Sequence, residues 1–88
     1  MANYIDVDIE EAVIALQNFE IVYLSGQPRA TSRTIAFHSR YECFQNGLGT
    51  FTITDQGRVV GEYKRPKKCL QVANSRQFAN GGFFLIEE

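Results

Sequence analysis

The run from Ile35 to Cys43 constrains the fold most, because its apolar and polar residues alternate along the chain. The mainly apolar parity comprises Ile35, Phe37, Tyr41 and Cys43, and the other comprises Ala36, His38, Arg40 and Glu42. Alternation over this length is typical of a β-strand with one buried and one solvated face. A helix is the alternative, because Phe37 and Tyr41 are four residues apart and Gly47 suits a helix C-terminus. The β-branched and aromatic residues of the run favour the strand.

A hairpin is expected to connect this strand to the next apolar segment. Matching the apolar faces sets Cys43 opposite Phe51, across a loop of residues 45–49. The alternative is a two-residue turn at positions 46–47, whose Asn-Gly sequence is a strong hairpin signal. That turn would place Phe51 opposite the charged Glu42, so the hydrophobic pattern favours the longer loop.

Two further turns extend the hairpin into a meander. Asp55-Gln56-Gly57 is typical of a type I turn followed by a left-handed glycine, and residues 65–68 suit a turn with proline at its second position. These turns predict the cross-strand pairs Thr54–Arg58, Ile53–Val59, Phe51–Gly61, Tyr63–Leu70 and Gly61–Val72. The sequence thus predicts a four-strand meander over about residues 34–73. Its buried face comprises Tyr41, Cys43, Phe51, Ile53, Val59, Tyr63, Leu70 and Val72.

The chain before this meander carries a helix signal. Asp8 suits a helix N-cap, and Glu11 three residues later completes a capping-box pattern. The apolar spacing predicts a helix from about Ile9 to Asn18, which is too short to be stable unless it docks on the sheet. The acidic residues at its start are explained by the helix dipole.

The overall class follows from these elements. Segments 20–24 and 82–86 are apolar on both parities, which predicts interior strands covered on both faces. Residues 25–28 predict a turn, and residues 74–81 favour one helical turn over a hairpin. We therefore expect an α+β fold, with one N-terminal helix packed on a mostly antiparallel five- or six-stranded sheet. Without a linker or repeat, the chain is expected to form a single domain, 1–88.

The chain offers little catalytic or metal-binding chemistry. In the predicted meander Cys43 faces the core and Cys69 faces the other side, so both are expected to be free thiols, as suits a cytoplasmic protein. The same geometry disfavours a metal site that combines His38 with these cysteines. In a strand Ser39 points away from His38, the one histidine, so the two cannot act as nucleophile and base. We expect no enzyme activity, no metal and no cofactor.

Charge is unevenly distributed, although the net charge is only −1. Residues 1–28 hold five acids and no bases, whereas residues 29–88 hold nine bases and five acids. The basic residues are either a solubilising surface or a binding site for phosphate or for an acidic protein. The candidate binding residues are Arg40, Arg58, Lys64, Arg65, Lys67, Lys68 and Arg76.

Small size, lack of chemistry, charge separation and open sheet edges together predict a protein-binding module. Such a module would be a regulator, inhibitor or accessory subunit, of the kind common among phage and mobile-element proteins. The expected partner is another protein, or a second copy paired through a sheet edge. No run approaches the length of a membrane span, so no membrane partner is expected.

Two other functions are weaker alternatives. The first is nucleic-acid binding by the basic stretch 58–68. Phe44 is the one aromatic on the predicted outer face that could stack on bases, and Glu42 and Glu62 there would repel phosphate. The second is a small-ligand pocket, although core packing explains its aromatic residues more simply. These residues are Tyr23, Tyr41, Tyr63, Phe83 and Phe84.

Overall fold

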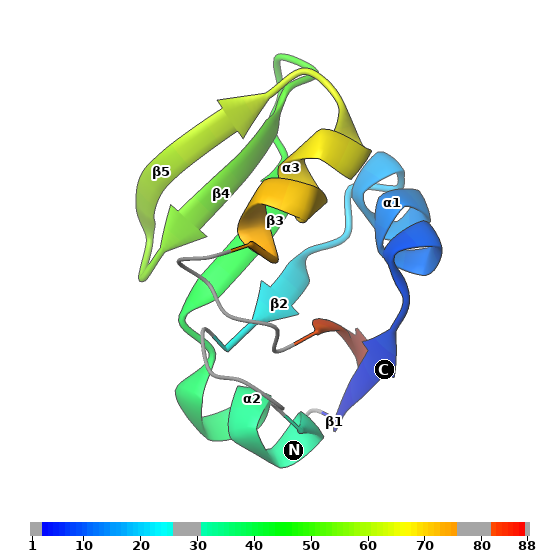
Figure 1. Cartoon of the computed structure of the whole chain (residues 1–88), viewed down its shortest axis with the longest axis vertical. Coiled ribbons are helices and arrows are strands. Elements are labelled where there is room, and N and C mark those ends of the chain that lie inside the picture. The colour runs from blue at the N-terminus through cyan, green and yellow to red at the C-terminus, as the bar shows by residue number, and fades with distance from the viewer. Residues whose placement is uncertain (1–2, 26–30, 76–81, 88) are drawn as a thin grey trace.

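One open antiparallel sheet organises the molecule (Figure 1). The computed structural model describes residues 3–25, 31–75 and 82–87. Within them, six strands lie in the order β1-β6-β2-β3-β4-β5, accompanied by three helices. Along the chain the elements are β1 (Asn3–Val7), α1 (Ile9–Gln17), β2 (Val22–Leu24), α2 (Ser32–His38), β3 (Tyr41–Gln45), β4 (Phe51–Asp55), β5 (Arg58–Tyr63), α3 (Pro66–Ala73) and β6 (Phe83–Glu87). The predicted α+β class is confirmed.

The two doubly apolar segments form interior strands, as predicted. β6 lies between β1 and β2, and β2 lies between β6 and β3. Residues 3–7, which we did not predict as a strand, form the edge strand β1, with Tyr4 opposite Ile86 and Val7 opposite Phe83. The expected turn and the expected helical turn fall mostly on 26–30 and 76–81, outside the described residues.

The N-terminal helix forms where its capping signal predicted it. The Asp8 carboxylate accepts a hydrogen bond of 2.8 Å from the backbone N–H of Glu11, which satisfies one of the free donors of the first turn. The helix buries Ala12, Ala15 and Leu16 completely or almost so. These small and apolar side chains let α1 dock closely on the sheet and on α3.

We predict that Asp8→Ala lowers the free energy of unfolding by about 1 kcal/mol, the usual effect of losing an N-cap. For a domain of this size, that corresponds to a fall in Tm of roughly 4–8 °C. Asp8→Asn is the matched control, because an amide oxygen still accepts the bond from Glu11. Equal destabilisation by both variants in thermal unfolding would contradict the capping role.

The predicted meander has three strands rather than four. In the β3–β4 hairpin Cys43 lies opposite Ile53, and Phe51 lies opposite Gln45. The predicted pair Cys43–Phe51 was therefore wrong by two residues, a shift that leaves the same side chains on the same face. The loop is again five residues long but spans 46–50.

The second hairpin also differs from the predicted pairing. Gln56 and Gly57 both have positive φ, 53° and 88°, so the connection is a two-residue turn between Asp55 and Arg58. Thr54 then pairs with Val59 and Ile53 with Gly61, across a bulge. The predicted pairs Thr54–Arg58, Ile53–Val59 and Phe51–Gly61 were wrong. The ring that covers Gly61 belongs to Tyr63, whose Cε2 lies 3.0 Å from where a Cβ would stand.

The start of the predicted long strand is the helix α2, which is a correction. The Thr31 hydroxyl accepts a hydrogen bond of 3.3 Å from the N–H of Thr34, and the N–H of Ser39 closes the helix on the Ile35 carbonyl. Among the α2 side chains whose burial the structure describes, Ile35 is fully buried and Ala36 is exposed. Because α2 has only seven residues, the alternation alone could not distinguish it from a strand.

The predicted fourth strand is the helix α3, which is a second correction. Pro66 occupies the first turn of the helix, where its missing N–H costs no intrahelical hydrogen bond. Cys69, Leu70 and Ala73 share one buried face. The predicted pairs Tyr63–Leu70 and Gly61–Val72 were therefore wrong, and so was the outward position of Cys69.

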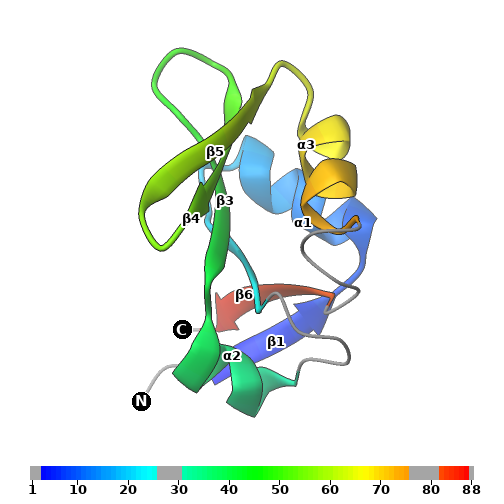
Figure 2. The same ribbon diagram turned by 60° about the vertical axis from the view of Figure 1, so that its left-hand side comes forward.

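The main core lies between the sheet and two helices. α1 and α3 contact each other and lie together on one side of the sheet (Figure 2). Phe83 and Leu85 contribute to this core, so the intervening Phe84 faces the other side of β6. Phe84 is 1% exposed and Ile35 is 0% exposed, although neither belongs to the main cluster. The sheet is therefore buried on both faces near β6, where α2 contacts β1.

Candidate functional site

The predicted basic residues divide between the two ends of β5. Arg40 and Arg58 lie beside Asp55, at the β4–β5 turn. Lys64 and Arg65 follow the other end of β5, about 20 Å away at the ordinary rise of a strand. A single surface containing every predicted residue does not exist, and Arg76 lies outside the described residues.

Arg40 is engaged in an ion pair. Its Nε lies 2.8 Å from Asp55 Oδ1, and its second nitrogen lies 3.2 Å from Oδ2. This paired contact lowers the pKa of Asp55 and raises the pKa of Arg40. The guanidinium also lies over the Tyr41 ring, 5.3 Å from its centre. Arg40 is therefore a poor candidate for binding an external phosphate.

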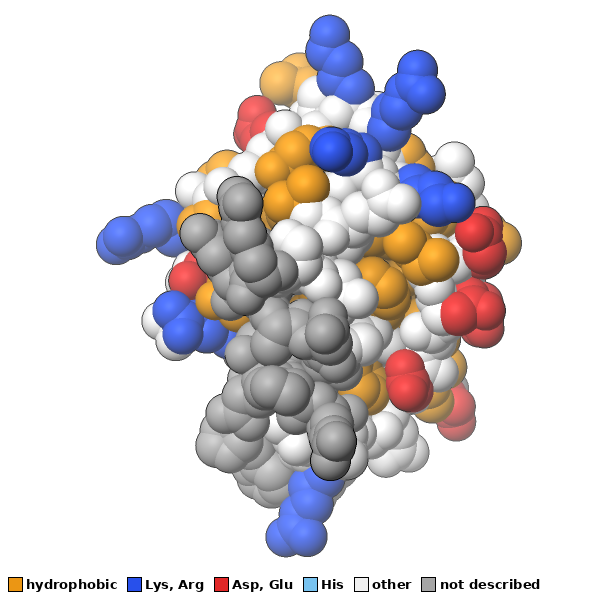
Figure 3. Space-filling model, in the orientation of Figure 1, with side chains coloured by type: hydrophobic (Ala, Val, Ile, Leu, Met, Phe, Trp, Pro, Cys, Tyr) orange, Lys and Arg blue, Asp and Glu red, His pale blue; other side chains and the backbone are white. Residues whose placement is uncertain are grey.

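The other end of β5 carries a denser group of cations. Lys64 and Arg65 precede α3, and Lys67 and Lys68 lie in its first turn. All four residues are exposed, and blue side chains gather over the β5–α3 connection in Figure 3. Lys67 lies 3.6 Å from Glu10 Oε1, but both side chains are more than half exposed, so this contact is weak.

An exposed leucine stands at the same end of the sheet. Gln45, Phe51 and Tyr63 lie opposite one another across β3, β4 and β5, which places the β3–β4 loop beside the β5–α3 connection. Leu48, in this loop, is 91% exposed. We call the surface formed by Leu48, Lys64, Arg65, Lys67 and Lys68 the basic tip.

Asn46 fixes the loop that presents Leu48. Its Oδ1 accepts hydrogen bonds from the backbone N–H groups of Leu48, at 2.8 Å, and Thr50, at 3.3 Å. Its Nδ2 donates to the hydroxyls of Thr50 and Thr52. Gly49 takes a φ of 84°, which glycine adopts without strain. The leucine is thus held in solvent by a preorganised loop, a feature that our sequence reading missed.

β5 adds an apolar sheet edge. Within the described structure it pairs with β4 alone. Val59 is 55% exposed and Val60 is 49% exposed. Val59 was predicted to be buried but is exposed, and it pairs with Thr54 rather than with the predicted Ile53.

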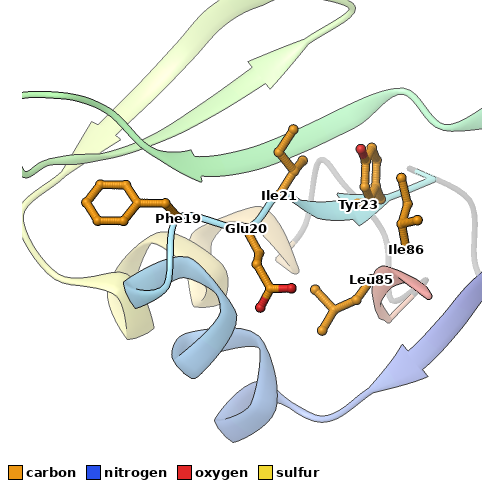
Figure 4. A pocket seen from close by; sticks show the side chains of 6 residues that line it. All are labelled: Phe19, Glu20, Ile21, Tyr23, Leu85 and Ile86. Carbon is orange, nitrogen blue, oxygen red and sulfur yellow. The ribbon is translucent and has the colours of Figure 1, made fainter. Parts of the chain in front are cut away.

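A hollow of about 540 Å³ lies on another part of the surface (Figure 4). Its walls come from the segment joining α1 to β2, from β2 itself and from the end of β6. They comprise Phe19, Glu20, Ile21, Tyr23, Leu85 and Ile86. Tyr23 is the only one of the predicted pocket aromatics in this wall. Burial and the nearby Glu42 carboxylate raise its pKa, and Tyr4 packs edge-on against it at 5.3 Å.

Phe19 has an unusual backbone. The N–H of Phe19 bonds to the Leu16 carbonyl and the N–H of Glu20 bonds to the Ala15 carbonyl, which is the Schellman arrangement at a helix end. Glycine usually occupies the left-handed position of this arrangement, but here it is Phe19, with φ 61°. For a residue with a Cβ this conformation costs roughly 1–2 kcal/mol, and the ring is 68% exposed.

The two cysteines lie together in the core. Both are 0% exposed, and a hydrogen bond between the two thiols, together with burial, raises the pKa of Cys43 well above its ordinary value. In the described part of the chain, no three His, Cys, Asp or Glu side chains are grouped so that they could hold a metal ion. No helix in that part is long and apolar enough to cross a membrane.

Comparison of the chain with known proteins and structures found no match. No protein-family model, no curated protein and no solved structure matches the chain. The function must therefore be inferred from the surface alone.

Proposed function

We propose that the protein is a small, non-enzymatic binding module that attaches to an acidic partner protein through the basic tip. It would act as a regulator, an inhibitor or an accessory subunit. The observation that carries this proposal is Leu48, which a fixed loop holds 91% exposed beside four cations.

An exposed leucine on a rigid loop is suited to a protein interface. The Leu48 side chain contributes little to the stability of the free protein, because almost none of its surface is buried there. The hydrogen bonds from Asn46 fix its position in advance, so little conformational entropy is lost when it enters an apolar recess of a partner. The cations around it would favour an acidic rim and raise the association rate.

The β5 edge extends this surface. Among the described residues no strand pairs with its outer side, and adding a further strand at such an edge is a common mode of protein recognition. The exposed Val59 and Val60 would be covered in such a complex. A second copy of the chain is another occupant of this edge, and light scattering over a range of protein concentrations would detect that dimer.

We expect Leu48→Asp to weaken partner binding by about 30-fold or more, the range of an interface hot spot. Affinity capture from the source cells would identify the partner, and titration with the purified partner would give the affinity.

Lys64→Glu should slow association with the partner and reduce the salt dependence of the association rate. Arg33→Glu is the matched control, because it makes the same charge change on exposed α2, which contacts β1 at the opposite edge of the sheet from β5. If Arg33→Glu weakens binding as much as Lys64→Glu, or if Leu48→Asp has no effect, the basic tip is not the interface.

Nucleic-acid binding through the same cations is the second candidate. It is favoured by the four basic residues before and within the first turn of α3, where backbone N–H groups also attract phosphate. Glu62 opposite Thr52 and Glu42 opposite Thr54 oppose it on the neighbouring sheet face. Salt-dependent retention on a nucleic-acid column, lost in Lys67→Ala with Lys68→Ala, would support it; no retention at low salt would exclude it.

A further inference from the structure

The hollow beside β6 arises because two neighbouring strands diverge. β2 and β6 pair at one position in the described structure, where Tyr23 lies opposite Phe84. Continuing this antiparallel register would set Ile21 opposite Ile86. Instead, both residues line a hollow of about 540 Å³. The chain therefore leaves an opening between β6 and the segment that leads into β2.

The walls of the opening combine apolar side chains with one acid. Figure 4 shows Ile21 and Tyr23 on one side, Leu85 and Ile86 on the other, and the Glu20 side chain extending between α1 and β6. Neither ion pair found in the described residues includes Glu20. An apolar surface with one unneutralised carboxylate is complementary to an aliphatic segment that carries one positive charge.

Phe19 supplies a second, independent reason to regard the opening as a binding site. Its left-handed backbone would be relaxed by glycine, and its ring, 68% exposed, extends outward at the rim, away from the other lining side chains (Figure 4). Strain and exposure together make this residue unfavourable for the free protein. Such outliers commonly mark functional positions, and a bound segment would cover the ring.

We propose that this opening binds an extended peptide segment of a partner protein, in which a lysine or arginine is flanked by aliphatic residues. The segment would lie along the diverging strands, its aliphatic side chains against Ile21, Leu85 and Ile86. Its cation would pair with the Glu20 carboxylate, and the segment would continue over the exposed Phe19 ring at the rim. This site selects a basic segment, whereas the basic tip selects an acidic surface, so the protein would join two different partners or two regions of one partner.

A random seven-residue peptide library displayed on phage tests this proposal directly. Selection against the full chain should enrich peptides with one Lys or Arg beside aliphatic residues. The same selection against Glu20→Lys should lose that consensus or replace the base with Asp or Glu. Glu62→Lys is the matched control, because it makes the same charge change on exposed β5, and it should retain the original consensus.

Phe19→Gly separates binding from folding. This substitution should raise Tm, because glycine relaxes the left-handed backbone. It should also weaken the binding of an enriched peptide by about 10-fold, as truncation of an aromatic anchor does. Unchanged peptide affinity in both Phe19→Gly and Glu20→Lys would overturn the proposal. Enrichment of acidic peptides alone, abolished by Leu48→Asp, would also overturn it while supporting the basic tip.

Discussion

Replacing Phe84 with alanine is expected to lower the free energy of unfolding by about 3–5 kcal/mol, the range for truncating a buried phenylalanine. A domain of this kind has a total stability of only about 5–15 kcal/mol, so a substantial fraction of the molecules would unfold at moderate temperature. Among the residues whose burial the structure describes, Phe84 is the largest fully buried side chain, 1% exposed. It belongs to β6, which pairs with both β1 and β2.

The position of Phe84 explains why the loss should be near the upper end of this range. Its ring lies on the face of β6 opposite the main core, so the residues of that core cannot move in to fill the cavity. The cost of a truncation rises with the cavity that remains. Loosening β6 would also weaken its pairing with the edge strand β1.

Phe19→Ala is the matched control for this prediction. It removes the same atoms from a ring that is 68% exposed, and surface truncations usually change stability by less than about 0.5 kcal/mol. Urea unfolding followed by circular dichroism would measure both variants. Similar urea midpoints for Phe84→Ala and Phe19→Ala would show that Phe84 does not stabilise the packing of β6 with its neighbours β1 and β2.

The sequence predicted which side chains of the strands face the core better than it predicted which residues lie opposite each other on neighbouring strands. The alternation of apolar residues in β3 and β4 correctly predicted that Cys43 and Ile53 face the core. A shift of two residues in strand pairing changes the partners but leaves each side chain on the same face of the sheet. The exact register depends on the Asn46 side chain, which closes the loop through hydrogen bonds. Such local hydrogen bonds have no signature in hydrophobic alternation.

The two missed helices are short, which explains the errors. α2 has seven residues and α3 has eight, so neither supplies enough periodicity to outweigh an alternating pattern. At α3 a proline was compatible with both a turn and a helix start. Tertiary packing of Leu70 and Cys69 against the sheet decided the outcome, and that packing is visible only in the folded chain.

The candidate site could be predicted only in part. The basic residues near α3 were evident from composition, but their separation from Arg40 and Arg58 depends on the length and direction of β5. Leu48 and Phe19 were missed because the hydrophobic pattern assigns no role to a single apolar residue in a loop or just after a helix. Their exposures of 91% and 68% are properties of the fold, not of local sequence.

The thiols of Cys43 and Cys69 are expected to react with Ellman's reagent at least about 1,000-fold more slowly in the native protein than in urea. Both side chains are 0% exposed, and groups in a core become accessible only through openings whose free energy approaches that of global unfolding. A 1,000-fold protection corresponds to an opening free energy of about 4 kcal/mol.

The pKa of Cys43 gives this protection a defined pH dependence. Cys69, through its hydrogen bond, and burial both hold the Cys43 pKa well above its ordinary value, so the native thiol stays neutral while an unfolded thiol ionises near pH 8.5. The stability that follows from this difference is fully present below about pH 8.5 and is lost as the pH rises from there through the native pKa. Stability measured between pH 7 and pH 10 should therefore decline in the upper half of the range.

Cys69→Ala, which removes the hydrogen bond but leaves Cys43 buried, should reduce this decline and keep the remaining thiol slow to react. Rapid labelling of either cysteine in native buffer would show that α3 is not docked on β3.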